Sequence, residues 1–134
     1  MDDIFVETSK CVTDTRGKLY PIEFGELPFK PKRMFLVYDV PAGITRGEHA
    51  HHITKQLLYC VKGEIKVTLE TVKDDPVSHI LTQGDFIFVD KMVWDSQTFL
   101  TGDDVLMVIA STEYNKDDYI VDKREFKQKY RDNA

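Results

Sequence analysis

Two histidines, His49 and His51, stand one residue apart in this chain, between the glycines Gly43 and Gly63. Alternate side chains of an extended strand point to the same face, so we expect both imidazoles to project together into whatever that sheet encloses. Neighbouring imidazoles can either hold a metal ion or move protons, because histidine titrates close to neutral pH. The pair therefore predicts a functional site.

The residues around the pair support a functional interpretation. Arg46 and Glu48 precede it and His52 follows it. Such a dense group of polar side chains costs free energy to bury unless the groups are used. We therefore assign function to His49 and His51, leave His52 open, and expect His79, alone in Val-Ser-His-Ile, to be structural.

The spacing Gly-x5-His-x-His-x4-Gln-x6-Gly resembles the first sequence motif of the cupin superfamily, whose fold is a double-stranded β-helix (jelly-roll) barrel. Metal-binding cupins carry a carboxylate where this chain has Gln56. A later cupin motif adds another histidine, and its counterpart here, which begins at Gly84, has Asp95 at that position. Transition metals prefer imidazole, thiolate or carboxylate to a carboxamide, so we predict chemistry without a metal or other cofactor. A site of two histidines and Asp95 is the alternative.

Length and composition predict one domain over residues 1–134. The chain is 42% apolar, which is enough for one core, and its net charge of −5 opposes nucleic-acid binding as the main role. The N-terminal Met-Asp-Asp-Ile lacks the features of an export signal, and no apolar run approaches the ~20 residues that span a membrane. We therefore expect a cytoplasmic protein without membrane contact. Cys11 and Cys60 are too few for a disulfide framework, and Cys60 is expected in the core.

Short β-branched and aromatic runs alternate with turn signals, which predicts an all-β barrel. A helix is expected only at Asp122–Tyr130, where Phe126 and Tyr130 are four residues apart. The expected strands are Met34–Val40, Gln56–Lys62, Glu64–Val72, Val77–Leu81, Phe86–Val89, Asp95–Phe99 and Val105–Ser111.

Further motifs narrow the resemblance to the sugar 3,4-ketoisomerases, small cupins of the WxcM-like family that act on dTDP-4-keto-6-deoxy-D-glucose. The motifs are Arg-Gly-Glu-His-Ala-His at 46–51, the turn at 14–19, Lys32-Arg33 before a strand ending Tyr38-Asp39, and the closing segments 110–114 and 118–120. The resemblance implies a metal-independent homodimer with an exchanged N-terminal strand, which moves the keto group from C4 to C3. A 3-aminotransferase would follow, giving a dTDP-3-amino-3,6-dideoxy sugar for a glycan. Trp94-Asp95 departs from members that have Trp-His, so the role of a third histidine does not carry over.

The histidine pair suits this reaction, which removes a proton from C3, passes through an enediol and delivers a proton to C4. Histidine has an ordinary pKa of ~6.5, so one neutral ring and one charged ring could coexist as base and acid. Our hypothesis makes His51 the base and His49 the acid or orienting partner. Donors to the enediolate oxygens are expected from Arg46, Arg16 or the catalytic candidate Tyr38.

A nucleotide diphosphate must also be held. Guanidinium groups present fork-shaped donors to phosphate oxygens, and Trp94 or Tyr114 could stack on the thymine. The expected substrate-binding residues are Arg16, Arg33, Arg46, Lys55, Gln56, Trp94, Asp95 and Tyr114.

Three other functions fit the same residues. A nucleotide-sugar 3,5-epimerase would return the proton to the same carbon and keep the ketone in place. A non-catalytic nucleotide-sugar-binding cupin would bind without turnover, and a metal cupin such as a dioxygenase would need an ion. The sequence leaves open the gluco or galacto configuration at C4 of the product.

Overall fold

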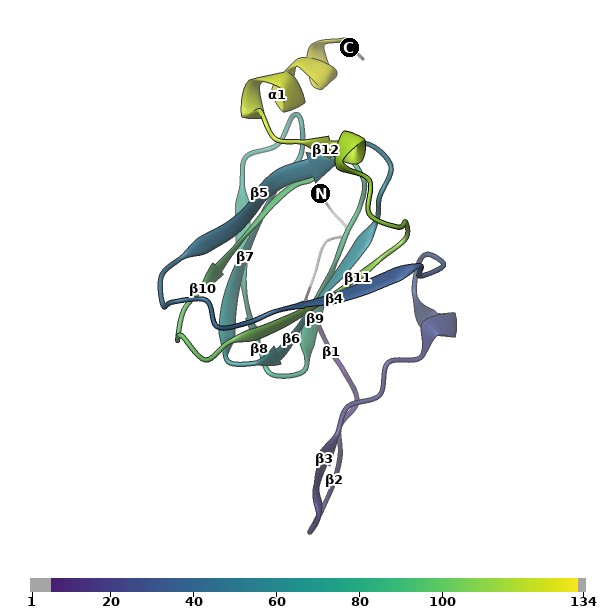
Figure 1. The fold of residues 1–134 in the computed structure, drawn as a ribbon, viewed down its shortest axis with the longest axis vertical. Helices are drawn as coiled ribbons and strands as arrows, with labels where there is room; N and C mark the ends of the chain where they lie inside the picture. The colour runs from purple at the N-terminus through teal and green to yellow at the C-terminus, as the bar shows by residue number, and fades with distance from the viewer. Residues whose placement is uncertain (1–5, 133–134) are drawn as a thin grey trace.

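The computed structural model describes residues 6–132, which form two five-stranded antiparallel sheets facing each other (Figure 1). The first sheet has the order β1 (Glu7–Thr8), β9 (Asp85–Val89), β6 (Gln56–Lys62), β11 (Val105–Ala110) and β4 (Arg33–Val37). The second has the order β12 (Tyr119–Ile120), β5 (Thr45–His51), β10 (Trp94–Phe99), β7 (Glu64–Glu70) and β8 (Val77–Thr82).

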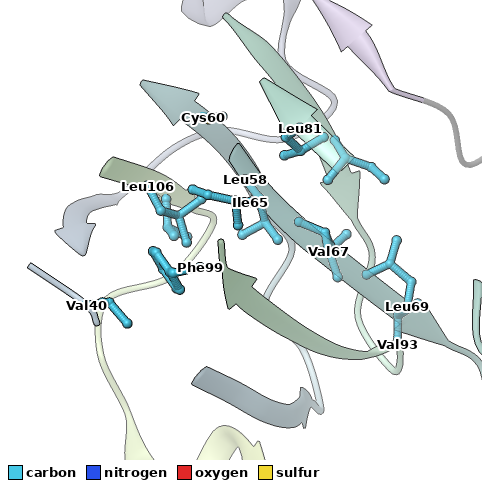
Figure 2. Packing of buried hydrophobic residues seen from close by; sticks show 13 residues of the cluster. Val40, Leu58, Cys60, Ile65, Val67, Leu69, Leu81, Val93, Phe99 and Leu106 are labelled. Carbon is cyan, nitrogen blue, oxygen red and sulfur yellow. The ribbon is translucent and has the colours of Figure 1, made fainter. Parts of the chain in front are cut away.

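The core fills the space between the sheets, and Figure 2 shows it from close by. On β7, the alternate residues Ile65, Val67 and Leu69 are fully buried, as expected of a strand with one face inward. They meet Phe99 from β10 and Leu58 from β6. Cys60 is buried in the same cluster, which confirms its expected place in the core.

The C-terminal helix α1 (Lys123–Asp132) packs outside the second sheet. Its Phe126 is fully buried against Trp94, with ring centroids 5.6 Å apart. Lys123 and Lys127 place their Nζ atoms 2.7 and 2.5 Å from the carboxylate oxygens of Glu70 on β7. Apolar packing and these two ion pairs fix the helix, and with it the segment that leads into it.

A hairpin of β2 (Val12–Asp14) and β3 (Gly17–Leu19) stands away from the barrel, at the end opposite α1 (Figure 1). Two 3-10 turns, η1 (Phe24–Glu26) and η2 (Lys116–Asp118), lie in the connecting segments. None of the helices in residues 6–132 has the length and apolar content to cross a bilayer.

The expected all-β cupin-like barrel with a short C-terminal helix is confirmed, and every predicted strand is present. Strand ends differ by up to three residues; for example, β4 ends at Val37 rather than at Val40. The helix begins one residue later than predicted and continues to Asp132, while the side chain of Tyr130 falls outside the described part. The sequence did not predict the bounds of β5. It also did not predict the two- and three-residue strands β1, β2, β3 and β12, because they are too short to show an alternating pattern.

Candidate active site

A β-bulge in β5 sets the direction of the two histidines. Asp95 of β10 pairs with His49, but the next residue, Ser96, pairs with Gly47, so Glu48 is the extra residue. Gly47 and Glu48 have positive φ values of 84° and 59°. A Cβ on Gly47 would lie 3.0 Å from two side-chain atoms of Gln97, so glycine suits both the backbone conformation and the space.

The bulge brings both imidazoles to the inner face of the barrel. Ala50, between them, is buried on the opposite face against the residues that pack on α1. The ring centroids of His49 and His51 are 5.0 Å apart at an interplanar angle of 85°. Tyr119 of β12 pairs with His51, and its ring centroid lies 5.0 Å from that of His49 and 4.4 Å from that of His51. The predicted common face of the histidine pair is therefore confirmed.

Asp118 fixes the orientation of His51. Nδ1 of His51 lies 3.0 Å from Oδ2 of Asp118, and both side chains are buried. The Ile53 amide donates to Oδ1 at 2.8 Å, and the Thr54 hydroxyl donates to Oδ2. An ionised carboxylate only accepts hydrogen bonds, so Nδ1 carries the proton and Nε2 has the free lone pair. Nε2 is buried and has no partner among the described residues, as a general base requires before substrate binds.

Desolvation determines the charge of both rings. Burial, together with the neighbouring His51, lowers the pKa of His49 to about 4, against the opposing effect of a hydrogen bond with the Gly47 backbone. Burial also lowers the pKa of His51, despite the opposing effect of Asp118. Burial would raise the pKa of Asp118, but its three hydrogen bonds hold it below the usual value. Both rings are thus neutral at pH 7 in the free protein, which corrects the expectation of one neutral and one charged ring.

Asp95 lies on the inner face of β10, because its partner on β7 is the core residue Leu69. It is fully buried and accepts a hydrogen bond from Nε2 of Gln97 at Oδ1. Oδ2 is buried without a partner among residues 6–132. Burial raises the pKa of Asp95 to about 7, against the hydrogen bond from Gln97, which lowers it.

Arg33 and Gln56 face the site from the other sheet. Arg33 of β4 and Gln56 of β6 are the two cross-strand partners of Ala110 on β11, the strand that lies between β4 and β6. Gln56 is buried on the same face as the core residue Leu58. The Nε atom of Arg33 is buried without a partner in the described chain, and its charge contributes to the lowered pKa of His51, so the guanidinium lies near the histidines.

Tyr114 extends this group toward the surface. The guanidinium carbon of Arg33 is 5.7 Å from its ring centroid, and the rings of Tyr114 and Tyr119 are 5.9 Å apart. Tyr114 is 68% exposed, so most of its ring is free to meet a ligand in the single chain. The structure therefore brings together five of the predicted residues with Tyr114: His49, His51, Arg33, Gln56 and Asp95.

Two predicted aromatic residues lie elsewhere, and in each case strand alternation is the reason. Tyr38 is 58% exposed on the outer face with Met34 and Leu36, whereas the residues between them face inward, so it does not reach the histidines of its own chain. Trp94 points away from Asp95, packs on Phe126, and has Nζ of Lys123 5.1 Å from its ring centroid. Stacking of Trp94 on thymine is therefore corrected to a role in holding α1.

The other basic residues that the sequence predicted to bind substrate do not lie beside the histidines. Arg16 lies in the turn between β2 and β3, where it pairs with Asp14 and is 88% exposed. This hairpin stands away from β5, the strand that carries the histidines (Figure 1). Arg46 pairs with Gln97 across the strands, but its side chain is exposed. Lys55 is half-buried before β6, and its backbone carbonyl accepts from the Ser111 amide. In the single chain, Arg33 is the basic residue that the structure ties to the site.

The donors for a metal are limited. Among residues 6–132, no three His, Cys, Asp or Glu side chains form a group that could hold a metal ion. The alternative site of His49, His51 and Asp95 gains no support from this arrangement, and activity without a metal stays a prediction.

The two facing antiparallel sheets, with a histidine pair on the inner face, define a small cupin-type barrel. A family model described as "FdtA: WxcM-like, C-terminal" matches residues 2–131, and the chain belongs to this family. A TDP-4-oxo-6-deoxy-α-D-glucose-3,4-oxoisomerase from Aneurinibacillus thermoaerophilus is 32% identical over 89% of this chain and 86% of its own.

Solved structures agree with this assignment. The sugar 3,4-ketoisomerase QdtA from Thermoanaerobacterium thermosaccharolyticum, in complex with TDP, is 28% identical, with a TM-score of 0.89 over 98% of this chain and 96% of that one. A dTDP-4-dehydrorhamnose 3,5-epimerase from Bacillus anthracis is 16% identical, with a TM-score of 0.78 over 87% of this chain and 77% of its own, and so shares the fold alone.

Proposed function

We propose that this protein is a TDP-4-keto-6-deoxyglucose 3,4-ketoisomerase. The observation that carries the proposal is the buried His51–Asp118 pair, with the free Nε2 of His51 on the inner face beside His49. The 3,4-oxoisomerase activity of the relative at 32% identity supports the same reaction.

Moving the ketone from C4 to C3 requires two proton movements. Carbon C3 loses a proton and C4 gains one; oxygen O3 loses a proton and O4 gains one. His51 acts on the carbons: Nε2 takes the C3 proton, and Asp118 stabilises the imidazolium that forms. A proton is then returned to C4 and completes the isomerisation.

His49 acts on the oxygens. A neutral imidazole can donate a hydrogen bond to a carbonyl oxygen and accept one from a hydroxyl, as in other enediol-forming enzymes with a histidine of lowered pKa. The lowered pKa of His49 keeps its ring neutral for this task at pH 7. Tyr119 packs on both rings and limits their movement.

Arg33 is the leading candidate for binding the diphosphate. Its Nε lacks a partner in the described chain, so an incoming phosphate would satisfy a buried donor. Tyr114, 5.7 Å away and largely exposed, is placed to stack on the thymine. Arg46 and Lys55 are secondary candidates, since neither side chain has a described link to the histidines.

We also infer a homodimer with an exchanged N-terminal strand. An isolated two-stranded hairpin is marginally stable in water, yet β2–β3 stands away from the barrel with Val12 and Leu19 each 59% exposed. Met34, Leu36 and Tyr38 expose a second apolar stripe. A second copy would cover these surfaces and bring Arg16 and Tyr38 to another chain. Light scattering at several concentrations tests this, and a monomer at all of them would contradict it.

A 3-aminotransferase is the expected next enzyme, because it would consume the 3-keto product. The competing functions are separated by incubating the protein with TDP-4-keto-6-deoxyglucose. A ketoisomerase yields a ketone at C3, whereas a 3,5-epimerase leaves it at C4. A non-catalytic binding protein returns the sugar unchanged.

A further inference from the structure

The proposed mechanism gives no task to the unpartnered oxygen of Asp95. The carboxyl group is fully buried in the barrel, and Gln97 satisfies only Oδ1. Burying a polar atom without a partner costs free energy, and an isolated charge costs far more. A buried carboxyl in this position is therefore expected to stay protonated and to have a role in the reaction.

The groups that face Asp95 come mainly from β5. His49 is its cross-strand partner, and opposite residues of an antiparallel pair have Cβ atoms about 4.5–5.5 Å apart. His51 lies on the same face, with Asp118 behind it. Other titratable or charged groups that strand register places on the inner face include Tyr119 of β12, Arg46 of β5, Arg33 of β4, Cys60 of β6 and His79 of β8. The apolar residues Leu69, Val89 and Val108 of β7, β9 and β11 face the same space.

We propose that Asp95 is the proton store for the oxygen half of the reaction, acting through His49. Asp95 holds a proton on Oδ2 in the free protein. As His49 gives its ring proton to O4, Oδ2 passes its own to His49. When the ketone forms at C3, His49 removes the O3 proton and returns a proton to Asp95. Each group ends as it began, so Asp95 is a positioning residue that needs no co-reactant.

The charge balance of the site favours this role. His49 and His51 are neutral in the free protein, so neither brings a spare proton to the reaction. The pKa of Asp95, raised by burial to about 7, leaves its carboxyl largely protonated in slightly acidic solution, where the other shifted Asp and Glu groups are ionised. Gln97 anchors Oδ1 and thus leaves Oδ2 as the oxygen that can exchange a proton.

The inference rests on the proposed function, and Asp95→Asn tests it. Asparagine keeps the size and an acceptor for Gln97 but carries no titrating proton. We expect kcat to fall roughly a hundredfold, the lower end for lost acid–base catalysis, with TDP binding unchanged. The wild-type kcat should also decline above pH about 7, and this decline should be absent from the variant. Ser96→Ala, on the next residue of β10, is the matched control with wild-type kcat and pH profile.

Infrared spectroscopy of the wild-type protein with 13C-labelled aspartate carboxyl groups measures the protonation state directly. This measurement does not require the variant to fold. At pH about 6, well above the ordinary Asp pKa of ~3.9, we expect the C=O band of a protonated carboxylic acid, which disappears at higher pH. The absence of that band would overturn the proposal. So would an Asp95→Asn enzyme with wild-type kcat, or a slow one that keeps the alkaline decline. If the wild type does not isomerise the sugar, the proposed function fails, while the band still shows where the proton resides.

Discussion

His51 and Asp118 are 67 positions apart in the chain, yet Nδ1 of the histidine lies 3.0 Å from Oδ2 of the carboxylate. The segment that carries Asp118 pairs with β5 through Tyr119 and then runs into α1. Phe126 and the Glu70 ion pairs hold that helix against the second sheet. Packing on the outside of the barrel thus positions the carboxylate that orients His51 inside it.

Replacing Asp118 with Asn should lower turnover by about 10²–10⁴, because an amide no longer fixes the Nδ1–H tautomer or stabilises the imidazolium. Asn can still accept from the Ile53 amide, so we expect TDP binding to be largely retained. Steady-state kinetics and calorimetry measure the two effects. Asp117→Asn is the matched control, since Asp117 is exposed. An Asp118→Asn enzyme with wild-type turnover would show that the carboxylate has no part in catalysis.

Neutralising Arg33 should weaken the binding of TDP itself. A charge-assisted hydrogen bond is worth ~1.5–3 kcal/mol, so Arg33→Gln is expected to raise Kd roughly ten- to a hundredfold. Arg124→Gln removes an arginine that is 94% exposed on α1 and should leave Kd unchanged. Equal affinities for all three proteins in calorimetry would remove Arg33 from the phosphate site.

The stability of the fold should depend on pH through two opposing groups. The pKa of His49 falls from 6.5 to about 4 on folding, so its contribution to stability is present above pH 6.5 and is lost as the pH falls toward 4. The pKa of Asp95 rises from 3.8 to about 7, so its contribution is present below pH 3.8 and is lost as the pH rises through 7. Each effect is on the order of 3 kcal/mol, and they largely cancel between these limits.

Single substitutions should expose the two effects. Between pH about 4 and 6.5, the unfolding free energy of Asp95→Asn should rise with pH more steeply than that of the wild type. That of His49→Asn should rise less steeply or fall. Urea denaturation across this range measures both slopes. Parallel curves for the three proteins would contradict the assigned protonation states.

Removal of metal ions should leave turnover unchanged. Gln56 occupies the position where metal-binding cupins carry a carboxylate, and a carboxamide is a weak ligand for transition metals. Exhaustive chelation followed by elemental analysis and an activity assay provides the measurement. Activity that is lost on chelation and restored by one specific ion would point instead to a metal enzyme.

The sequence predicted the barrel because its strands are long enough to alternate, and it predicted the histidine pair because two residues on one strand share a face. Gln56 and Asp95 were found through motif spacing. Tyr38 and Trp94 were misplaced because an aromatic residue gives no sign of which face its strand turns inward. The Gly47–Glu48 bulge, which sets that phase in β5, leaves no pattern apart from the glycine.

Asp118 and Tyr119 were overlooked as functional residues for a different reason. Both belong to a motif that resembles the ketoisomerases, but neither has a chemical partner nearby in the sequence. Their partners on β5 are brought close only by the path of the C-terminal segment across the sheet. Contacts of this kind depend on tertiary structure, which local spacing does not encode.

The most direct test of the proposed function is NMR of the sugar after incubation of TDP-4-keto-6-deoxyglucose with the protein in D₂O. The wild type should give a product with the ketone at C3 and deuterium at C4. His51→Asn should abolish exchange at C3, because this variant lacks the proposed base. His49→Asn should allow that exchange but form little product. Turnover should fall by about 10²–10⁴ in either variant. A product that keeps its ketone at C4 and gains deuterium at C3 or C5, or a sugar recovered unchanged, would contradict the assignment as a 3,4-ketoisomerase.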